Sequence, residues 1–156
     1  MPRIVAQHCA IIPATTAAVY EVLRDYEVGH PAILPPEHFS RLEIEQGGRG
    51  EGTVIRFAFT AVGATSLHRV IICEPEPGHR LVEMNPRDGT CTSFLLHAAD
   101  HGAATRLTIR TELRASGARG WLMRAVLPST LRHVYAKQAR NLMTLLGTGD
   151  AMTALA

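Results

Sequence analysis

The spacing of hydrophobic residues changes along the chain, and each spacing predicts a different kind of element. Residues 3–12 are rich in Ile, Val and Ala and end at Pro13, which predicts a first strand. Apolar residues then recur at steps of three and four. This spacing predicts a short helix over residues 17–26, capped by Thr15 or Thr16.

Beyond this helix the chain first contains several prolines and then has apolar residues at every second position. Three of the six residues 31–36 are proline, which allows at most one further helical turn. Alternating apolar and polar residues then predict six strands, at residues 41–45, 55–60, 67–73, 80–84, 91–98 and 105–114. Short Gly-rich and Asp-Gly turns separate them, so we expect consecutive strands to be antiparallel neighbours.

The final segment, residues 118–147, has the pattern of a long amphipathic helix. Steps of four, three, four and three residues place one set of side chains on a single helical face: Leu131, Tyr135, Gln138, Leu142 and Leu145. Pro128 is expected either to kink this helix or to begin its main part.

Together these elements predict an α+β fold of two layers. A seven-stranded curved antiparallel sheet wraps around the long C-terminal helix, and two short helices follow the first strand. The length is that of one domain, which we expect over residues 1–147, with a flexible C-terminal tail over residues 148–156.

Four segments occur in an order and spacing typical of a known superfamily. They are residues 12–25 (IPATTAAVYEVLRD), 74–81 (EPEPGHRL), 104–108 (ATRLT) and 138–143 (QARNLM). The chain therefore resembles the START and polyketide cyclase/dehydrase (SRPBCC) superfamily, whose members have the helix-grip fold. The resemblance implies a cavity between the sheet and the last helix. Its cyclases, hydrolases, lipid carriers and co-chaperones share an architecture and no common residue set, so it transfers no catalytic residue.

One departure from the superfamily pattern concerns the cavity entrance. Many bacterial members carry a tryptophan in the stretch after the first helix, which here is residues 29–34 and contains none. The only tryptophan of this chain is Trp121, at the start of the final helix. We therefore expect an entrance of different shape.

Apolar residues of the predicted strands would line the concave face of the sheet. The predicted ligand-binding residues are Ile55, Phe57, Phe59, His68, Phe94, Leu96, Leu107 and Ile109 on strands, with Leu131, Tyr135 and Gln138 on the last helix. Such a wall suits a hydrophobic ligand oriented by a few polar groups. The alternative is ordinary core packing against the helix. A ligand, a water or the sheet would have to satisfy the amide of Gln138 if it is buried.

His68 and Tyr135 are the candidates for catalysis, if the protein is an enzyme. His68 has the parity of Ile72 and is the better inward candidate, where its ring would serve as acid, base or orienting donor. His97 faces water if Phe94 faces inward.

Charged residues within the strands have two interpretations. Arg56 and Arg69 would either fix a ligand carboxylate bidentately or lie on the solvated face of the sheet. The glutamate pairs at positions 43 and 45 and at 74 and 76 have the spacing of solvated edges, unlike an acid/base dyad, which requires burial.

No metal or cofactor is predicted. The eight histidines form no recognisable metal-ligand motif on one predicted element. Cys9, Cys73 and Cys91 lie in apolar stretches without CxxC spacing, so we expect buried free thiols.

Composition and charge restrict the partners. Fifteen of the sixteen basic residues are arginine, as in GC-rich bacterial genomes, and the net charge of +2 is too small to indicate nucleic-acid binding. His133, Lys137 and Arg140 form a basic stripe on the last helix, which is either a solvated face or a surface for anionic lipid or an acidic protein. No export-signal pattern and no membrane-spanning run is present, so a cytoplasmic protein is expected.

Three hypotheses for function follow. We favour a protein that binds a small hydrophobic molecule (a lipid, polyketide or aromatic metabolite) between the sheet and the last helix. The alternative is a cofactor-independent cyclase, dehydratase or hydrolase acting on a polyketide-like substrate in the same cavity. The third is an interaction module for a protein or a membrane surface that uses the basic helix. The edges of an incomplete sheet also allow a homodimer.

Overall fold

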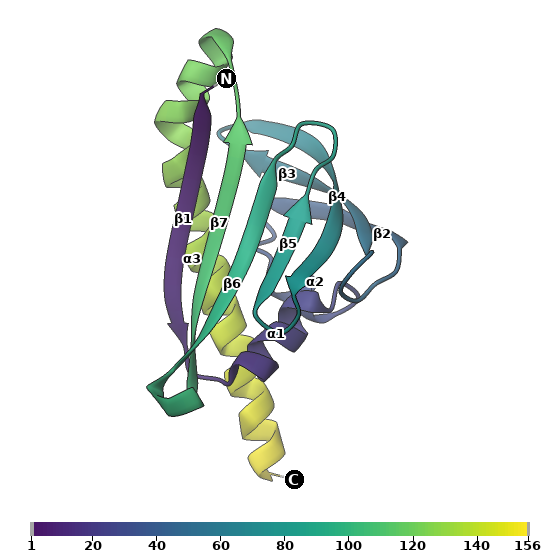
Figure 1. The fold of residues 1–156 in the computed structure, drawn as a ribbon, viewed down its shortest axis with the longest axis vertical. Helices are drawn as coiled ribbons and strands as arrows, with labels where there is room; N and C mark the ends of the chain where they lie inside the picture. The colour runs from purple at the N-terminus through teal and green to yellow at the C-terminus, as the bar shows by residue number, and fades with distance from the viewer. Residues whose placement is uncertain (1, 156) are drawn as a thin grey trace.

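The computed structural model describes residues 2–155, with side chains described for residues 2–147, and its strands form one sheet. The strands are β1 (Arg3–Ile12), β2 (Phe39–Gln46), β3 (Val54–Ala61), β4 (Ala64–Glu76), β5 (Arg80–Met84), β6 (Cys91–Ala99) and β7 (Ala104–Arg114). The helices are α1 (Thr16–Arg24), α2 (Gly29–Ile33), the 3-10 turn η1 (Asp100–Gly102) and α3 (Gly117–Leu155). The predicted helix-grip architecture is confirmed (Figure 1).

The sheet order is β1-β7-β6-β5-β4-β3-β2, and every neighbouring pair is antiparallel. One row of paired residues crosses five strands: Ile72, Glu83, Thr92, Thr111 and Ala6. Because side chains alternate between the faces of a sheet, this row and the residues two positions away on each strand point to one side. That side, which faces α3, is called the inward face below.

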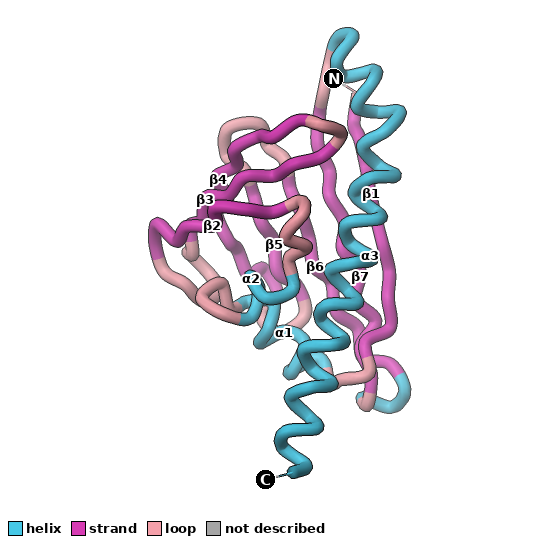
Figure 2. The backbone as a smooth tube through the Cα atoms, turned by 180° about the vertical axis from the view of Figure 1, so that it is seen from behind, coloured by secondary structure: helices cyan, strands magenta, loops and turns pink. Residues whose placement is uncertain are grey.

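The core lies where α3 meets β1, α1 and α2. Helix α3 runs behind β1 and β7, whereas β2, β3 and β4 lie at the opposite lateral end of the sheet, apart from α3 (Figures 1 and 2). Five fully buried residues represent the elements that meet there: Ile12, Leu23, Ile33, Leu107 and Leu142. Removing such apolar surface from water contributes about 25 cal/mol per Å² and is the main stabilising term of the fold.

The first helix is shorter than predicted, and the second short helix that was expected follows it. Thr15 is the N-cap of α1 and accepts a hydrogen bond from the N–H of Ala18, but α1 ends at Arg24. The carboxylate of Asp25 then accepts hydrogen bonds from the backbone N–H groups of residues 27, 28 and 29, which starts α2 at Gly29. Burial opposes the charge of Asp25, yet these donors hold its pKa below the usual range.

Helix α3 is longer than predicted and continues through Pro128, so the alternative in which proline begins the main helix is wrong. It extends to Leu155, past the predicted end at Gly147 and into the segment expected as a tail. Leu145 is 37% exposed, which corrects its assignment to the apolar face. A spacing of 3.5 residues drifts by about 20° per heptad from an α-helix, so Leu145 has turned away from the stripe of Leu131.

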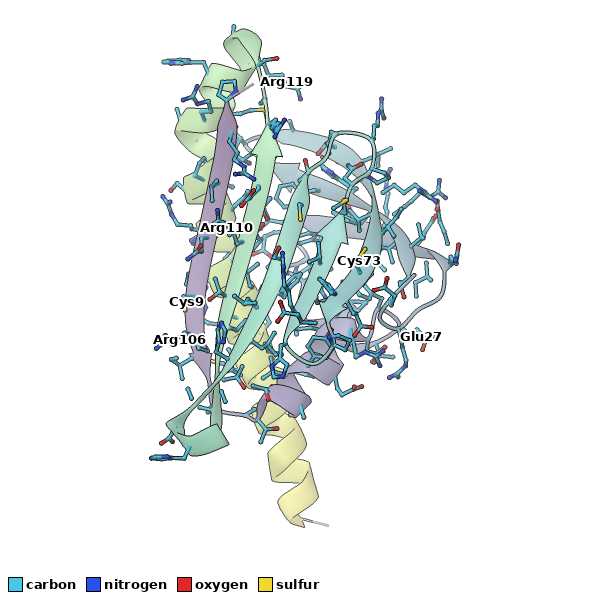
Figure 3. All side chains as sticks on the ribbon, viewed as in Figure 1. Cys9, Glu27, Cys73, Arg106, Arg110 and Arg119 are labelled. Carbon is cyan, nitrogen blue, oxygen red and sulfur yellow. The ribbon has the colours of Figure 1, made fainter. Side chains whose placement is uncertain are left out.

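Two predictions of burial are also wrong. Cys9 points outward from β1 and is exposed, and Cys73 and Cys91 are only half-buried, although all three thiols are free (Figure 3). Glu74 was expected at a solvated edge of the sheet, but its side chain is only 7% exposed.

A hydrogen-bonded cluster around Glu74 joins α1 to the loop after β2. Its carboxylate accepts from the hydroxyl of Tyr20 (2.7 Å), the guanidinium of Arg24 (3.2 Å) and the N–H of Glu51 (2.6 Å). Gly50 passes beside this cluster with φ +62°, and a Cβ there would lie 1.9 Å from a carboxylate oxygen of Glu74. The glycine is required both by its backbone conformation and by this approach.

Strand β2 alternates less regularly than predicted. Its pairing with β3 shifts register between Ser40 and Glu43 and again between Ile44 and Gln46. A bulge of this kind inserts an unpaired residue and turns neighbouring side chains. Leu42 is therefore half-buried while Ile44 is 38% exposed.

Candidate ligand-binding site

The inward face has two halves that differ in burial. The covered half, on β6 and β7, carries Phe94, Leu96, Leu107 and Ile109, each at most 2% exposed. The open half, on β2, β3 and β4, carries Phe39, Phe57, Phe59 and His68, which are only half-buried. Helix α3 lies along β1 and contacts α1 and α2, so it covers the first half and leaves the second uncovered (Figure 2).

The uncovered rings of the open half contact one another and form what we call the aromatic wall: Phe39, Phe57, Phe59 and His68. Phe39 lies 5.8 Å from Phe57 and 5.1 Å from Phe59 between ring centroids, and His68 stacks on Phe57 at 5.4 Å. Rings at these separations are attractive pairs and fix one another's orientation. The wall therefore presents an ordered apolar surface that the described part of the chain buries only in part.

A pocket of about 650 Å³ opens at one side of the aromatic wall. Strand β5 ends at Met84, opposite Ile71, while β4 continues to Ala64, so the sheet parts between β4 and the loop after β5. The pocket is lined by Arg41, Glu43, Arg56, Phe57, Leu67, His68, Arg69, Asn85, Pro86 and Arg87. Its volume falls in the range of small-molecule sites.

Four arginines form a rim around this pocket, which we call the arginine rim: Arg41, Arg56, Arg69 and Arg87. Arg56 forms ion pairs with Glu43 (2.9 Å) and Glu45 (2.8 Å), and Arg69 pairs with Glu45 (2.7 Å). Both lie on the outer, solvated face, as one of the two interpretations of the sequence held. Arg41 and Arg87 form no ion pair with any residue that the structure describes, so their guanidinium groups are available to an anion.

His68 points inward, as its parity predicts, and His97 is exposed. The Nε2 atom of His68 lies 2.7 Å from the hydroxyl oxygen of Ser66. Burial lowers the pKa of His68 below its usual 6.5, and the carboxylate of Asp88 opposes that shift weakly. The imidazole is therefore mainly neutral near physiological pH, which suits stacking against an apolar ligand and also proton acceptance.

Tyr135 joins a chain of hydroxyl groups on the row that crosses the sheet. Its hydroxyl is hydrogen-bonded to that of Thr111, which lies 2.7 Å from the hydroxyl of Thr92. Burial raises the pKa of Tyr135 to about 12, although its threonine partners oppose the shift. Tyr135 therefore keeps its proton at physiological pH and is a hydrogen-bonding group, not a base.

The same row carries a carboxylate that was not among the predicted site residues, that of Glu83, whose side chain is 13% exposed. Glu83 accepts a hydrogen bond from the hydroxyl of Tyr26 (2.8 Å), and Nε2 of His30 lies 3.4 Å from the same oxygen. Nδ1 of His30 lies 2.7 Å from the carbonyl oxygen of Leu23, which only accepts, so Nδ1 carries a proton. Burial and the neighbouring carboxylate raise the pKa of Tyr26 well above 10, which keeps it a donor. The inward orientation of Glu83 could have been predicted from the sequence, because Glu83 lies two residues after Leu81 on the same strand and therefore points to the same face.

Gln138 is 2% exposed, yet its amide forms no hydrogen bond within the described part of the chain. No fully buried side-chain nitrogen or oxygen among the described residues lacks a partner, so this amide retains contact with solvent-accessible space. Of the three partners considered for the amide of Gln138, the sheet makes no hydrogen bond to it within the described residues. The amide is free to bond a ligand or a water.

The structure thus divides the predicted site residues into three groups. Phe57, Phe59 and His68 lie on the open half. Tyr135 projects from α3 onto the row, where it meets Thr111, and Gln138 is buried on the same helix. The remainder belong to the packed core: Ile55, Phe94, Leu96, Leu107, Ile109 and Leu131.

No three His, Cys, Asp or Glu side chains that the structure describes are grouped to hold a metal ion. His97 and His101 are four residues apart, but they belong to β6 and η1 and are both exposed. In the described residues, no helix is long and apolar enough to span a bilayer.

The family of the chain is established by its sequence. The model of the family described as polyketide cyclase / dehydrase and lipid transport matches residues 3–147, and the chain belongs to this family. The resemblance stated from four short segments is confirmed. No curated protein matches the sequence significantly.

Solved structures with the same fold cover nearly the whole chain. The KanY protein has a TM-score of 0.81 at 21% identity, over 94% of this chain and 99% of that one. A START superfamily protein from Mycobacterium smegmatis has a TM-score of 0.71 at 13% identity, over 90% and 98% of the two chains. The Zhui aromatase/cyclase from a Streptomyces species has a TM-score of 0.70 at 18% identity, over 99% and 97%. At these identities the likeness establishes the fold alone.

Proposed function

We propose that the protein binds a small hydrophobic molecule, of the lipid, polyketide or aromatic-metabolite class, against the aromatic wall of the open half. The observation that carries the proposal is the incomplete burial of Phe39, Phe57, Phe59 and His68 on the inward face. Covering such rings with an apolar ligand removes them from water, and each fully buried side chain contributes roughly 1.5–3 kcal/mol.

Polar groups on α3 and along the pocket support the same proposal. Gln138 and the hydroxyl of Tyr135 lie on the helix side, and Arg41 and Arg87 lie at the rim. A ligand pocket is typically apolar with a few polar groups that set orientation. The ligand would place its apolar body on the wall and a polar group toward one of these donors.

The test is native mass spectrometry of the purified protein, followed by titration with an environment-sensitive naphthalene dye. We expect a co-purified apolar molecule or dye binding that is lost in Phe57→Ala/Phe59→Ala. The matched control is Ile11→Ala, which removes an exposed apolar side chain from the outer face of β1. Absence of both ligand and dye binding, or equal dye binding by the two variants, contradicts the proposal.

A cyclase- or dehydratase-type enzyme is the second candidate, and the group around Glu83 favours it. A carboxylate with a tyrosine donor at 2.8 Å and an imidazole at 3.4 Å is equipped to take a proton from carbon and to return it to oxygen. His68, near the pocket mouth, is the further candidate base among the residues predicted from sequence.

The two candidates are separated by Glu83→Gln, which keeps the shape of the side chain and removes its charge. If the protein is an enzyme, this variant loses turnover of a poly-β-ketone thioester and retains dye binding. If wild-type protein leaves that probe unchanged while binding the dye, ligand binding alone is supported.

The cytoplasmic location and the homodimer that were expected from the sequence stay predictions.

A further inference from the structure

The first two turns of α3, residues 117–124, project beyond the ends of β1 and β7 and are called the α3 tip (Figure 1). Trp121 is 72% exposed and Leu122 is 56% exposed, although the preceding residue, Gly120, is buried. Elsewhere in the described chain the exposed large apolar residues are separated from one another in sequence. Adjacent exposed tryptophan and leucine side chains indicate a surface that contacts something apolar.

Basic residues flank this apolar pair. Arg119 and Arg124 are exposed and make no ion pair with any described residue, and Figure 3 shows Arg119 at the projecting end of the molecule. Residues 113–147 contain no Asp or Glu, and the preceding acid, Glu112, is paired with Arg3 and Arg110. The α3 tip therefore combines an apolar pair with positive charge that the protein does not neutralise.

The basic stripe predicted from sequence lies on the same helix but lacks this combination. Lys137 of the stripe forms an ion pair with Glu37 at 2.5 Å, and the helix around it is packed on α2 and β1. The structure thus moves the interaction surface from the middle of α3 to its tip.

We propose that the α3 tip docks on the surface of a bilayer that contains anionic phospholipid. Trp121 and Leu122 would enter the interfacial region, where amphipathic and apolar side chains are stabilised, while Arg119 and Arg124 contact phosphate groups. The charge of the tip is complementary to such a surface, and each arginine near it adds to the attraction. The proposal is independent of what binds at the aromatic wall.

The experiment uses the single tryptophan of the chain, Trp121, as its own reporter. The full-length protein is titrated with vesicles of phosphatidylglycerol mixed with phosphatidylcholine and with vesicles of phosphatidylcholine alone. We expect a blue shift of the tryptophan emission and co-sedimentation with the anionic vesicles, both weakened by salt.

Charge reversal tests the arginines against a matched control. Arg119→Glu/Arg124→Glu is expected to weaken vesicle binding at least about tenfold. Arg106→Glu/Arg132→Glu makes the same change of net charge at exposed positions outside the tip and is expected to bind almost as the wild type does. Leu122→Asp, whose side chain is exposed and whose folding is verified by circular dichroism, should also reduce binding.

Three results would overturn the proposal. The first is no emission shift with anionic vesicles. The second is equal loss of binding in the two double variants, which would mean that net charge alone governs it. The third is a blue shift that grows with protein concentration in the absence of lipid, which would show that a second copy covers the tip.

Discussion

The covered and open halves of the inward face have similar apolar composition but different burial. Phe94, Leu96, Leu107 and Ile109 on β6 and β7 are packed against the helices, whereas Phe39, Phe57 and Phe59 on β2 and β3 keep part of their surface exposed. The difference comes from the position of α3 along β1, at one end of the sheet, which leaves β2 to β4 at the other end without a covering helix of this length (Figure 2). The same type of side chain therefore stabilises the fold in one half and is available to a ligand in the other.

The largest expected effect is on the covered half. Phe94→Ala should lower the free energy of unfolding by about 3–5 kcal/mol, because a fully buried ring leaves a cavity. Urea denaturation followed by far-UV circular dichroism measures this loss. A loss below about 1 kcal/mol, well short of that range, would show that the covered half is not close-packed.

The same truncation in the open half should act on binding more than on stability. Phe57→Ala is expected to reduce affinity for the naphthalene dye about tenfold, while the free energy of unfolding falls by less than half as much as in Phe94→Ala, because the ring is half-buried. The two variants are compared in one denaturation series and one dye titration. Equal stability losses with unchanged dye affinity would erase the distinction between the halves.

The pocket mouth should distinguish ligands by charge. Arg41→Ala/Arg87→Ala is expected to reduce affinity for a naphthalene sulfonate several-fold and to leave affinity for an uncharged naphthalene unchanged, since both guanidinium groups lack a partner among the described residues. Arg106→Ala, on the outer face of β7, is the control. Parallel loss for both dyes would place the arginines outside the binding site.

Protonation of His68 should weaken the open half in acid. The unfolded chain takes up this proton near pH 6.5, and the folded chain takes it up only at lower pH, because burial lowers the pKa of His68. The free energy of unfolding is therefore unaffected by His68 above pH 6.5. It falls as the pH drops from 6.5 toward the lower pKa that His68 has in the folded protein. Dye affinity should fall over the acid range too, and His68→Phe should remove both dependences. The pH series is measured with wild type and variant side by side.

The smallest expected effect on stability is at Gln138. Gln138→Leu removes an amide that makes no hydrogen bond within the described protein, so the free energy of unfolding should stay unchanged or rise slightly. A ligand that uses the amide would bind less tightly to the variant. Calorimetric unfolding with and without dye separates the effect on stability from the effect on ligand affinity. A loss of stability above about 1 kcal/mol would mean that the amide has a structural partner after all.

The fold followed from the sequence because local periodicity determines it. The alternation of β7 and the apolar stripe of α3 required a two-layer packing, and Thr15 marked the start of α1. Errors occurred where non-local contacts decide the outcome. Glu74 is buried because Tyr20 and Arg24 reach it across the chain, and the bulges of β2 break an alternation that the sequence suggested.

The alternation of residues along the strands predicted only part of the candidate site. Parity correctly placed Phe57 and His68 on the inward face, but it could not distinguish an inward residue under α3 from one that α3 leaves uncovered. The group of Glu83, Tyr26 and His30 comes from β5, α2 and the turn between α1 and α2, where the Asp25 carboxylate accepts from the backbone N–H of Gly29. No spacing in the sequence expresses such a meeting.

The most direct test of the two-halves account uses the four phenylalanines of the chain, three of which lie on the open half and one on the covered half. The protein is labelled at phenylalanine with carbon-13 and its ring signals are followed by NMR during titration with the naphthalene dye. We expect the ring signals of Phe39, Phe57 and Phe59 to shift together as the dye is added, while the signal of Phe94 stays unchanged. A shift of Phe94 as large as the others, or none at the three rings of the wall, would contradict it.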